Sequence, residues 1–157
     1  MKTRKDHPGV FVPPPLFYAA VFFAAMGLQR VLPLDRRFFL GGGSRFLGWT
    51  ALVLCFAMTL PALIRFLLTR NTLVTVLPAR SLQTTGIYAI SRNPMYVGLA
   101  LLYTGLACWL GNWWHFILLP LLLLVVQEYI IKREERYLVR RFGQEFTDYM
   151  ARVRRWL

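Results

Sequence analysis

The residues best suited to chemistry lie in a short polar stretch, residues 84 to 98, between two apolar segments. Asn93 directly precedes Pro94, a pair that favours a helix start, because proline suits the first helical position and asparagine can cap open N–H groups. Three further residues that can contact a ligand lie nearby: Tyr88, Arg92 and Tyr96. A helix N-terminus in such surroundings can receive a polar, partly anionic ligand. The stretch alone would equally serve as a well-capped start of a membrane helix.

Acidic side chains form a second candidate group. The chain has only seven acidic residues, and three of them lie where a long apolar segment ends: Glu128, Glu134 and Glu135. Carboxylates at such a position are costly unless they are paired or solvated in a cavity. Two interpretations stay open. The carboxylates pair along the helix with Lys132, Arg133 or Arg136, or one of them holds the ammonium group of a bound ligand.

The composition indicates that these groups are positioned by membrane helices. Of the 157 residues, 57% are hydrophobic, which is above the usual share in soluble domains. The net charge of +12 comes from cations that flank the apolar segments. Membrane topology and anionic headgroups explain those cations more simply than nucleic acid does, so we expect no nucleic-acid partner. Two cysteines within apolar segments and two separate, interfacial histidines give no metal-binding pattern, and we expect no metal: Cys55, Cys108, His7 and His115.

We therefore expect an all-α integral membrane protein that forms a single domain, residues 1–157. A bilayer requires about 20 apolar residues per helix, and four segments approach that length: residues 11–28, 46–68, 94–110 and 113–131. Glycines 41–43 lie in the expected first loop, and Pro61 predicts a kink in the second span. A turn at Gly111 makes the last two spans an antiparallel hairpin. An interfacial segment, residues 69–93, precedes the third span.

The distribution of basic residues predicts an orientation. With four spans, both termini lie on the side that holds most cations, which include Lys2, Arg4, Lys5, Arg65, Arg70, Arg80, Arg92 and the basic tail after residue 131. The positive-inside bias places that side in the cytoplasm, and we expect a bacterial inner membrane. The first loop departs from this pattern because it carries Arg30, Arg36, Arg37 and Arg45.

The C-terminal region shows apolar residues at intervals of three or four: Leu138, Phe142, Phe146, Tyr149, Val153 and Trp156. This spacing predicts one amphipathic, cytoplasmic helix. The helix either rests on lipid headgroups through its arginines or folds back as a lid onto the segment before Pro94. The spacing is compatible with both.

Taken in order, these stretches resemble the isoprenylcysteine carboxyl methyltransferase family, which is related to the membrane phospholipid N-methyltransferases. The resemblance covers about residues 82 to 153. It rests on Gly-x-Tyr, Arg-Asn-Pro-x-Tyr-x-Gly, a helical hairpin, Glu-Glu-x-x-Leu and Phe-Gly-x-x-Phe-x-x-Tyr. The residues concerned are Gly86, Tyr88, Arg92, Asn93, Pro94, Tyr96, Gly98, Glu134, Glu135, Leu138, Phe142, Gly143, Phe146 and Tyr149.

The resemblance implies S-adenosylmethionine as the methyl donor, bound at the cytoplasmic face by residues 82–96 and 128–153. The cofactor-binding residues that it implies are Leu82, Gln83, Tyr88, Asn93, Pro94, Met95, Tyr96, Glu134 and Glu135, with Glu134 facing the amino-acid end. The residue types agree with this cofactor. A glutamate suits its ammonium group, aromatic faces suit its adenine, and tyrosine faces attract its sulfonium.

The implied reaction is methyl transfer to a lipophilic, membrane-embedded acceptor, with Arg92 as a candidate anchor for the reacting group. This chain has Asn93 where the family usually has histidine, and Ile130 where the prenylcysteine branch has an arginine implicated in substrate binding. Because this stretch has no histidine to deprotonate an amine, we expect a carboxylate acceptor. Alternatives are a phospholipid amine N-methyltransferase, an NADPH-dependent membrane reductase and a non-catalytic membrane scaffold. Expected partners are membrane lipids and a lipophilic or lipidated substrate.

Overall fold

The computed structural model describes residues 9–10, 12–69 and 81–157. Over these residues the chain is helical and contains no strand. The elements are α1 (Pro14–Val31), α2 (Arg37–Leu40), α3 (Gly42–Leu68), the 3₁₀ helix η1 (Gly86–Ala89), α4 (Pro94–Leu110), α5 (Trp113–Val125), the π-helix η2 (Val126–Ile131), α6 (Lys132–Phe142) and α7 (Gln144–Arg152). The N-terminal cations, His7 and residues 70–80 of the expected interfacial segment lie outside the described residues.

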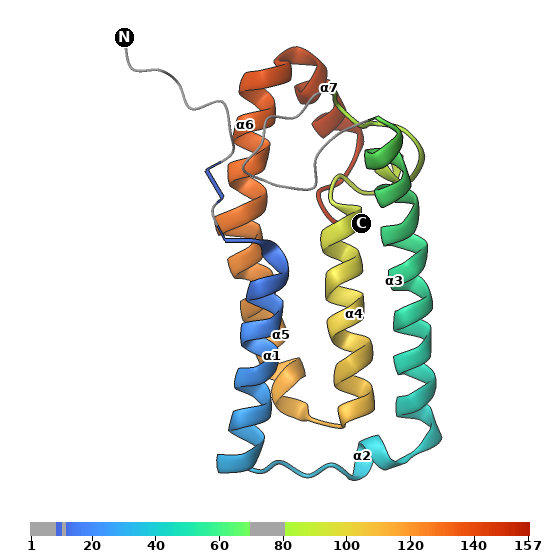
Figure 1. Cartoon of the computed structure of the whole chain (residues 1–157), viewed down its shortest axis with the longest axis vertical. Coiled ribbons are helices and arrows are strands. Elements are labelled where there is room, and N and C mark those ends of the chain that lie inside the picture. Colours follow the sequence, from blue (N-terminus) through green and yellow to red (C-terminus); the bar gives the residue numbers. More distant parts are fainter. Residues whose placement is uncertain (1–8, 11, 70–80) are drawn as a thin grey trace.

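The long helices run side by side and alternate in direction (Figure 1). α2 links α1 to α3 at one end of the molecule, and a turn at that same end joins α4 to α5. α4 packs chiefly on α3, whereas α5 packs chiefly on α1. The start of α4, the top of α6, α7 and the C-terminus therefore share the opposite end of the molecule.

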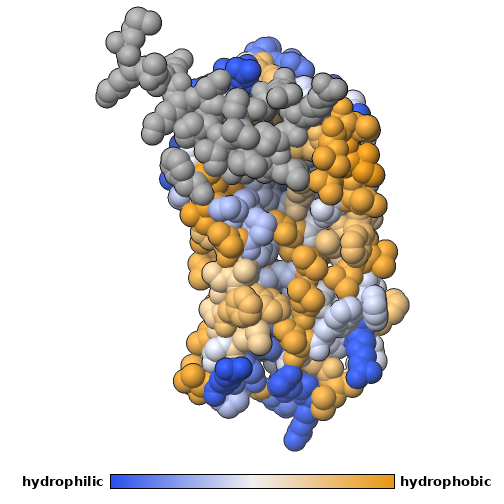
Figure 2. Space-filling view, in the orientation of Figure 1, coloured by the Kyte–Doolittle hydropathy of each residue, from blue (hydrophilic) through white to orange (hydrophobic). Residues whose placement is uncertain are grey.

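Among the described residues, two helices are long and apolar enough to cross a membrane: α3, and the continuous helix Trp113–Phe142 made of α5, η2 and α6. Only 17% and 28% of their most apolar windows are buried inside the chain, so neither is the core helix of a soluble protein. Large apolar side chains along α3 point outward, among them Phe46, Trp49, Val53 and Phe56. Figure 2 shows apolar atoms over the middle of one face and hydrophilic atoms at its lower end. These features support a membrane location.

The helix boundaries agree with the expected spans in part. The third expected span, residues 94–110, matches α4 at both ends. The first was placed three residues too early, because Pro14 takes the first position of α1. The second begins earlier than expected, so Gly42 and Gly43 lie in α3 and not in a loop, and α3 continues through Pro61. The fourth begins at Trp113 as expected, but its helix continues beyond residue 131 to Phe142. The four-span arrangement remains a prediction.

The turn between α4 and α5 is built from polar contacts. Gly111 has a φ of 61°, the left-handed conformation that ends many helices, and this confirms the tight turn expected there. Asn112 caps α5, because its side chain accepts a hydrogen bond from the backbone N–H of Trp114. Arg36 donates hydrogen bonds to the carbonyl oxygens of Leu110 and of Gly111, the latter at 2.7 Å. A cation thereby meets the negative end of the α4 dipole.

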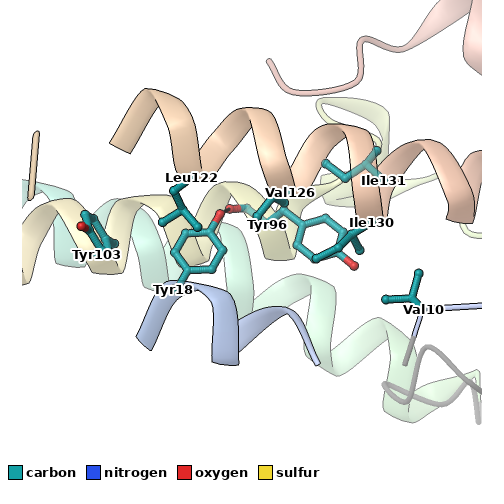
Figure 3. Packing of buried hydrophobic residues seen from close by; sticks show 8 residues of the cluster. All are labelled: Val10, Tyr18, Tyr96, Tyr103, Leu122, Val126, Ile130 and Ile131. Carbon is teal, nitrogen blue, oxygen red and sulfur yellow. Dashed lines mark hydrogen bonds between the residues drawn. The ribbon is translucent and has the colours of Figure 1, made fainter. Parts of the chain in front are cut away.

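A core of aromatic and aliphatic side chains lies between α1, α4 and the α5–η2 helix (Figure 3). The Tyr18 hydroxyl donates to the backbone oxygen of Tyr96 at 3.4 Å. His115 was expected at the interface, but it is fully buried, and its Nδ1 lies 3.2 Å from the Tyr103 hydroxyl. The expectation was wrong because His115 lies on the inner face of α5, where it packs against Phe22 of α1.

Glycines allow α3 and α4 to approach closely. A Cβ added at Gly105 would lie 3.0 Å from the backbone oxygen of Gly48, and one added at Gly98 would overlap the Thr59 hydroxyl. Such small-residue contacts are typical of packed membrane helices. These contacts hold α4 against α3, and they thereby fix the position of the first turns of α4.

The C-terminal region is two helices and not the single amphipathic helix that the apolar spacing predicted. Gly143 has a φ of 57° and separates α6 from α7, so the chain turns back on itself. Phe146 and Tyr149 of α7 then pack with Ala62 of α3 and with Tyr88 of η1. The apolar residues of α7 therefore cover the segment before Pro94, as the fold-back interpretation expected. Motion of this part as a lid remains a prediction.

Candidate functional site

Three parts of the chain meet where α4 begins. They are the segment from η1 to the first turn of α4, the first turn of α6, and the C-terminal residues 153–157 after α7. Of the residues expected to bind the cofactor, the contacts join Tyr96 to Glu134 and connect Asn93 and Glu135 through the C-terminal segment. Leu82 and Met95 pack with Tyr88 in one apolar cluster.

The start of α4 differs from the expectation in one respect. Pro94 occupies the first helical position as predicted, but the Asn93 side chain forms no capping hydrogen bond. Its amide donates instead to the backbone oxygen of Arg155 at 2.9 Å. The prediction of a cap was wrong because the C-terminal segment lies against Asn93 and supplies a carbonyl partner. The backbone N–H of Arg92 likewise donates to the oxygen of Arg154 at 3.0 Å.

Glu134 is a partly buried carboxylate with a neutral partner. The Tyr96 hydroxyl donates a hydrogen bond of 2.8 Å to its Oε1. No cation forms an ion pair with Glu134 in the described part of the chain. Burial raises the pKa of Glu134 to about 7, while the bond from Tyr96 acts in the opposite direction and the neighbouring Glu135 adds to the rise. A cationic ligand next to Glu134 would therefore stabilise the ionised form of its carboxylate.

Glu135 is buried and doubly paired. Its Oε1 lies 3.0 Å from Arg92 Nη2, and its two carboxylate oxygens accept from Arg155 Nε at 3.0 Å and Nη2 at 2.7 Å. Pairing with helix neighbours, the simpler of the two interpretations, holds for Glu128, which contacts Lys132. It is wrong for Glu135, whose partners come from other segments. Two arginines at one carboxylate leave Glu134 as the uncompensated acid.

Tyr88 is held by contacts that leave its hydroxyl without a hydrogen-bond partner among the described residues. Its ring stacks on Phe66 at 6.0 Å, and its backbone oxygen accepts from the Tyr149 hydroxyl at 2.6 Å. The Tyr88 hydroxyl is buried and has no hydrogen-bond partner among the described residues. The same is true of Arg92 Nε. Buried polar atoms without partners are rare, so these two atoms and the Glu134 carboxylate are candidates for contacting a ligand.

Other residues singled out from the sequence take different positions. The Gln83 amide donates to Ser81 Oγ at 2.9 Å. Ile130, at the position of the family's substrate-binding arginine, is fully buried in the core. Arg133 does not replace that arginine, because its guanidinium lies 4.2 Å from the centre of the Tyr129 ring and donates to the Gly9 oxygen.

Sequence reasoning missed Arg155, which lies two residues beyond the region expected to bind the cofactor. Its contact with Glu135 joins residues 20 positions apart across the break at Gly143. A prediction of one uninterrupted C-terminal helix cannot bring these residues together. The available signal was the run Arg154-Arg155-Trp156 at the end of an apolar pattern, too little to identify a partner.

An apolar groove approaches the site from the side of the helices. It has a volume of about 530 Å³ and lies between α4 and α5, with Val97, Leu101, Leu119 and Leu123 among its lining residues. Gln127 and Trp156 also line it, and they are joined by a 2.9 Å hydrogen bond from the Trp156 indole to the Gln127 oxygen. The groove thus ends at the C-terminal segment that contacts Asn93.

Comparison with known proteins adds to this geometry. Residues 44–145 match the family model of the phospholipid methyltransferases. The chain is 40% identical over 63 residues to an uncharacterized protein of Haemophilus influenzae, a match that covers 40% of this chain and 100% of that protein. It is 39% identical over 72 residues to the protein-S-isoprenylcysteine O-methyltransferase of Schizosaccharomyces pombe, covering 46% of this chain and 30% of the relative. No solved structure matches the chain.

Proposed function

Because this chain belongs to the phospholipid methyltransferase family, whose model matches residues 44–145, we propose that it transfers a methyl group from S-adenosylmethionine to a lipophilic acceptor in the membrane. Family membership confirms the resemblance recognised in residues 82 to 153. The family and the yeast relative support methyl transfer to a lipid-related acceptor. The match to that relative spans under a third of its length, so its activity transfers to this chain only as part of the proposal.

The observation that carries the proposal is the state of the Glu134 carboxylate, which belongs to α6 and lies beside the start of α4. It is partly buried, hydrogen-bonded by Tyr96 and free of any ion pair in the described part of the chain. A carboxylate in this state is suited to the ammonium group of an amino-acid moiety. The buried hydroxyl of Tyr88 and the Nε of Arg92, which have no hydrogen-bond partner within the described ranges, can add hydrogen bonds to a polar ligand.

The residues present therefore fit S-adenosylmethionine, which supplies an activated methyl group on a sulfonium when bound. Glu134 would hold its ammonium group, and the tyrosine rings would face its cationic and aromatic parts. The remaining residues proposed to line the pocket are Leu82, Gln83, Asn93, Pro94, Met95 and Glu135. Glu135 contributes by holding Arg92 and not by contacting the ammonium, because both its oxygens are occupied.

For the acceptor we propose a lipophilic molecule with a carboxylate. Arg92 is a suitable anchor because its Nη2 pairs with Glu135, while its Nε has no hydrogen-bond partner in the part of the chain that the structure describes. The apolar groove between α4 and α5 supports a hydrocarbon-bearing substrate, since it ends next to the site. A carboxylate can react without a general base, so the protein has to align the partners and exclude water. We place the site and both termini in the cytoplasm, at a bacterial inner membrane.

The test is a calorimetric titration that measures the binding of S-adenosylmethionine to the detergent-purified protein. We expect saturable binding that Glu134→Gln weakens at least tenfold, because removal of a partly buried charge partner typically costs several kcal/mol. Glu145→Gln is the matched control, since Glu145 lies exposed on α7 and loses the same charge. Binding of NADPH in place of S-adenosylmethionine would support a reductase. Binding of neither cofactor would support a scaffold.

The description of the family model favours one further candidate, methylation of a phospholipid amine. Incubation of membranes with methyl-labelled S-adenosylmethionine separates the two acceptors. Base-labile label in lipid extracts indicates a methyl ester and supports the carboxylate. Base-stable label in the headgroup fraction indicates an amine and would replace the carboxylate with the phospholipid.

A further inference from the structure

The C-terminal segment, residues 153–157, crosses the site and contacts both of its walls. On the α4 side, the backbone oxygens of Arg154 and Arg155 accept hydrogen bonds from Arg92 and Asn93 at 3.0 and 2.9 Å. On the other side, the Trp156 indole donates to Gln127 of η2 at 2.9 Å. The segment therefore joins the two walls of the site through two backbone oxygens and the Trp156 indole.

Arg155 makes the strongest of these contacts. Its guanidinium meets the Glu135 carboxylate with two hydrogen bonds, the fork geometry that arginine provides and lysine does not. The same carboxylate pairs with Arg92, and the side chains of Arg92 and Glu135 are only 10% and 12% exposed. Charge-assisted bonds in such surroundings are worth more than pairs at an exposed surface.

We propose that Arg155 is a positioning residue of the site: it holds Glu135, and through Glu135 the Arg92 guanidinium, so that Glu134 stays available to the ammonium group of the cofactor. This inference rests on the proposed function, because it assigns Arg155 a part in binding S-adenosylmethionine. No atom of Arg155 is required to contact the cofactor. Its effect passes through Glu135.

The charges around Glu134 give the physical reason. In the described part of the chain, Tyr96 faces it from α4, Tyr88 from η1 and Glu135 from the adjacent position of α6. Arg92 and Arg155 lie behind Glu135 and compensate its negative charge. Without Arg155, one cation would serve two adjacent carboxylates. Arg92 would then be drawn toward Glu134, or Glu134 would ionise less readily beside an incompletely compensated neighbour.

The first variant is Arg155→Ala, with Arg154→Ala as the matched control. Arg154 is the adjacent arginine, and its side chain is exposed and forms no ion pair within residues 81–157. We expect Arg155→Ala to weaken binding of S-adenosylmethionine about tenfold. The pH dependence of binding should move to lower pH if Arg92 pairs with Glu134, and to higher pH if Glu134 ionises less readily. Arg154→Ala should stay within about twofold, and Arg155→Lys should lie between the two because it restores charge without the fork.

A second readout needs no cofactor. If Arg155 fastens the segment, the backbone N–H of Arg92, which donates to the Arg154 oxygen, should exchange with solvent several-fold faster in Arg155→Ala than in Arg154→Ala. Thermal unfolding in detergent identifies any variant that has lost its fold. If Arg155→Ala does not fold, Arg155→Lys and Glu135→Gln, which nearly keep the size of the side chains, replace it in the binding measurement.

A double-mutant cycle tests whether the effect passes through Glu135. If it does, Arg155→Ala combined with Glu135→Gln should bind S-adenosylmethionine no more weakly than the weaker single variant. Additive losses would overturn the assignment, and so would wild-type affinity in Arg155→Ala. Absence of S-adenosylmethionine binding by the wild-type protein would instead overturn the proposed function. The hydrogen-exchange comparison separates these two failures, because it reports on Arg155 in the absence of the cofactor.

Discussion

Glu134 and Glu135 are neighbours in the sequence but have opposite electrostatic surroundings. Glu135 faces Arg92 and Arg155, whereas Glu134 faces the hydroxyl of Tyr96. Consecutive residues on a helix point about 100° apart, so one of the pair can be compensated by arginines while the other remains free for a ligand. A pair of glutamates in a family motif therefore need not imply two equivalent roles.

The pKa of Glu134 leads to a pH-dependent prediction. Burial raises this pKa to about 7, above the ordinary 4.5, so the unliganded fold loses stability as the pH rises from about 4.5 through 7. Cofactor binding requires the ionised form and should strengthen between about pH 6 and pH 8. The bond from Tyr96 lowers the pKa, so Tyr96→Phe should move the binding curve to higher pH. Calorimetric titration of S-adenosylmethionine across that range measures both effects.

Tyr129→Phe is the control for this experiment, because Tyr129 packs against Phe17, and in the described part of the chain its hydroxyl forms no hydrogen bond with Glu134. Its curve should coincide with that of the wild type. A wild-type affinity that does not change with pH would show that Glu134 does not titrate in this range. A Tyr96→Phe curve that coincides with the wild-type curve would show that the hydrogen bond from Tyr96 does not control the pKa of Glu134.

At the scale of single residues, the sequence identifies the residues of the candidate site better than it predicts their contacts. Tyr96 and Glu134 were both identified from the motifs, and they meet at 2.8 Å. The expected cap by Asn93 failed because a distant carbonyl competes for its side chain. Arg155 was missed for the same reason, since its partner is chosen by the path of the chain after Gly143. Such contacts depend on tertiary structure and leave no local signal.

The contact between α3 and α4 at Gly98 and Gly105, called the seam below, explains why glycine ends the Arg-Asn-Pro-x-Tyr-x-Gly motif. A Cβ at Gly98 would overlap the Thr59 hydroxyl, so Gly98→Ala should lower the free energy of unfolding by about 1–3 kcal/mol. Thr59→Ala removes the overlapping hydroxyl and should restore much of the loss in the double variant. Thermal unfolding in detergent measures the change.

Gly27→Ala is the matched control for this substitution. Gly27 lies in α1, and a Cβ there meets no atom within 4 Å. Alanine is the better helix former, so this variant should be neutral or slightly more stable than the wild type. Equal losses from Gly27→Ala and Gly98→Ala would show that the effect is not specific to the seam.

Element boundaries were predictable where local chemistry sets them. Pro94 and Gly111 delimit α4, and both ends were placed correctly from the sequence. The break at Gly143 was not predicted, because apolar residues on either side keep a helical spacing across it. The extent of α3 was also misjudged. Gly42 and Gly43 suggested a loop, but they occupy the first turn of α3, outside the helix interior to which the cost of glycine applies.

At the scale of the whole molecule, apolar segments predicted the long helices because their outer surfaces are apolar as well as their contacts. The pairing of helices was not predictable. α3 packs with α4 and α1 with α5, a choice made by glycines and aromatic rings and not by overall hydropathy. The location of the site depends instead on the turn at Gly111, which was predicted and which brings α6 and the start of α4 to the same end.

The expected orientation can be tested with single cysteines on the two ends of the molecule. Trp113→Cys marks the turn at the start of α5, and Arg154→Cys marks the exposed surface beside the site. A membrane-impermeant maleimide should label Trp113→Cys in intact cells and Arg154→Cys only after permeabilisation. The unsubstituted protein is the control, because Cys55 and Cys108 are buried. The reverse pattern would place the site outside the cytoplasm.

The π-helix η2 also has a consequence for helical phase. A π-turn holds about one residue more than an α-turn, so residues after Ile131 are rotated by roughly 100° relative to an uninterrupted α-helix. Val126 and Ile130 both face the core across this wide turn. A helical wheel drawn through Trp113–Phe142 at constant pitch would therefore assign Glu134 and Glu135 to the wrong sides of the helix. The extra residue sets which of the two acids faces Tyr96.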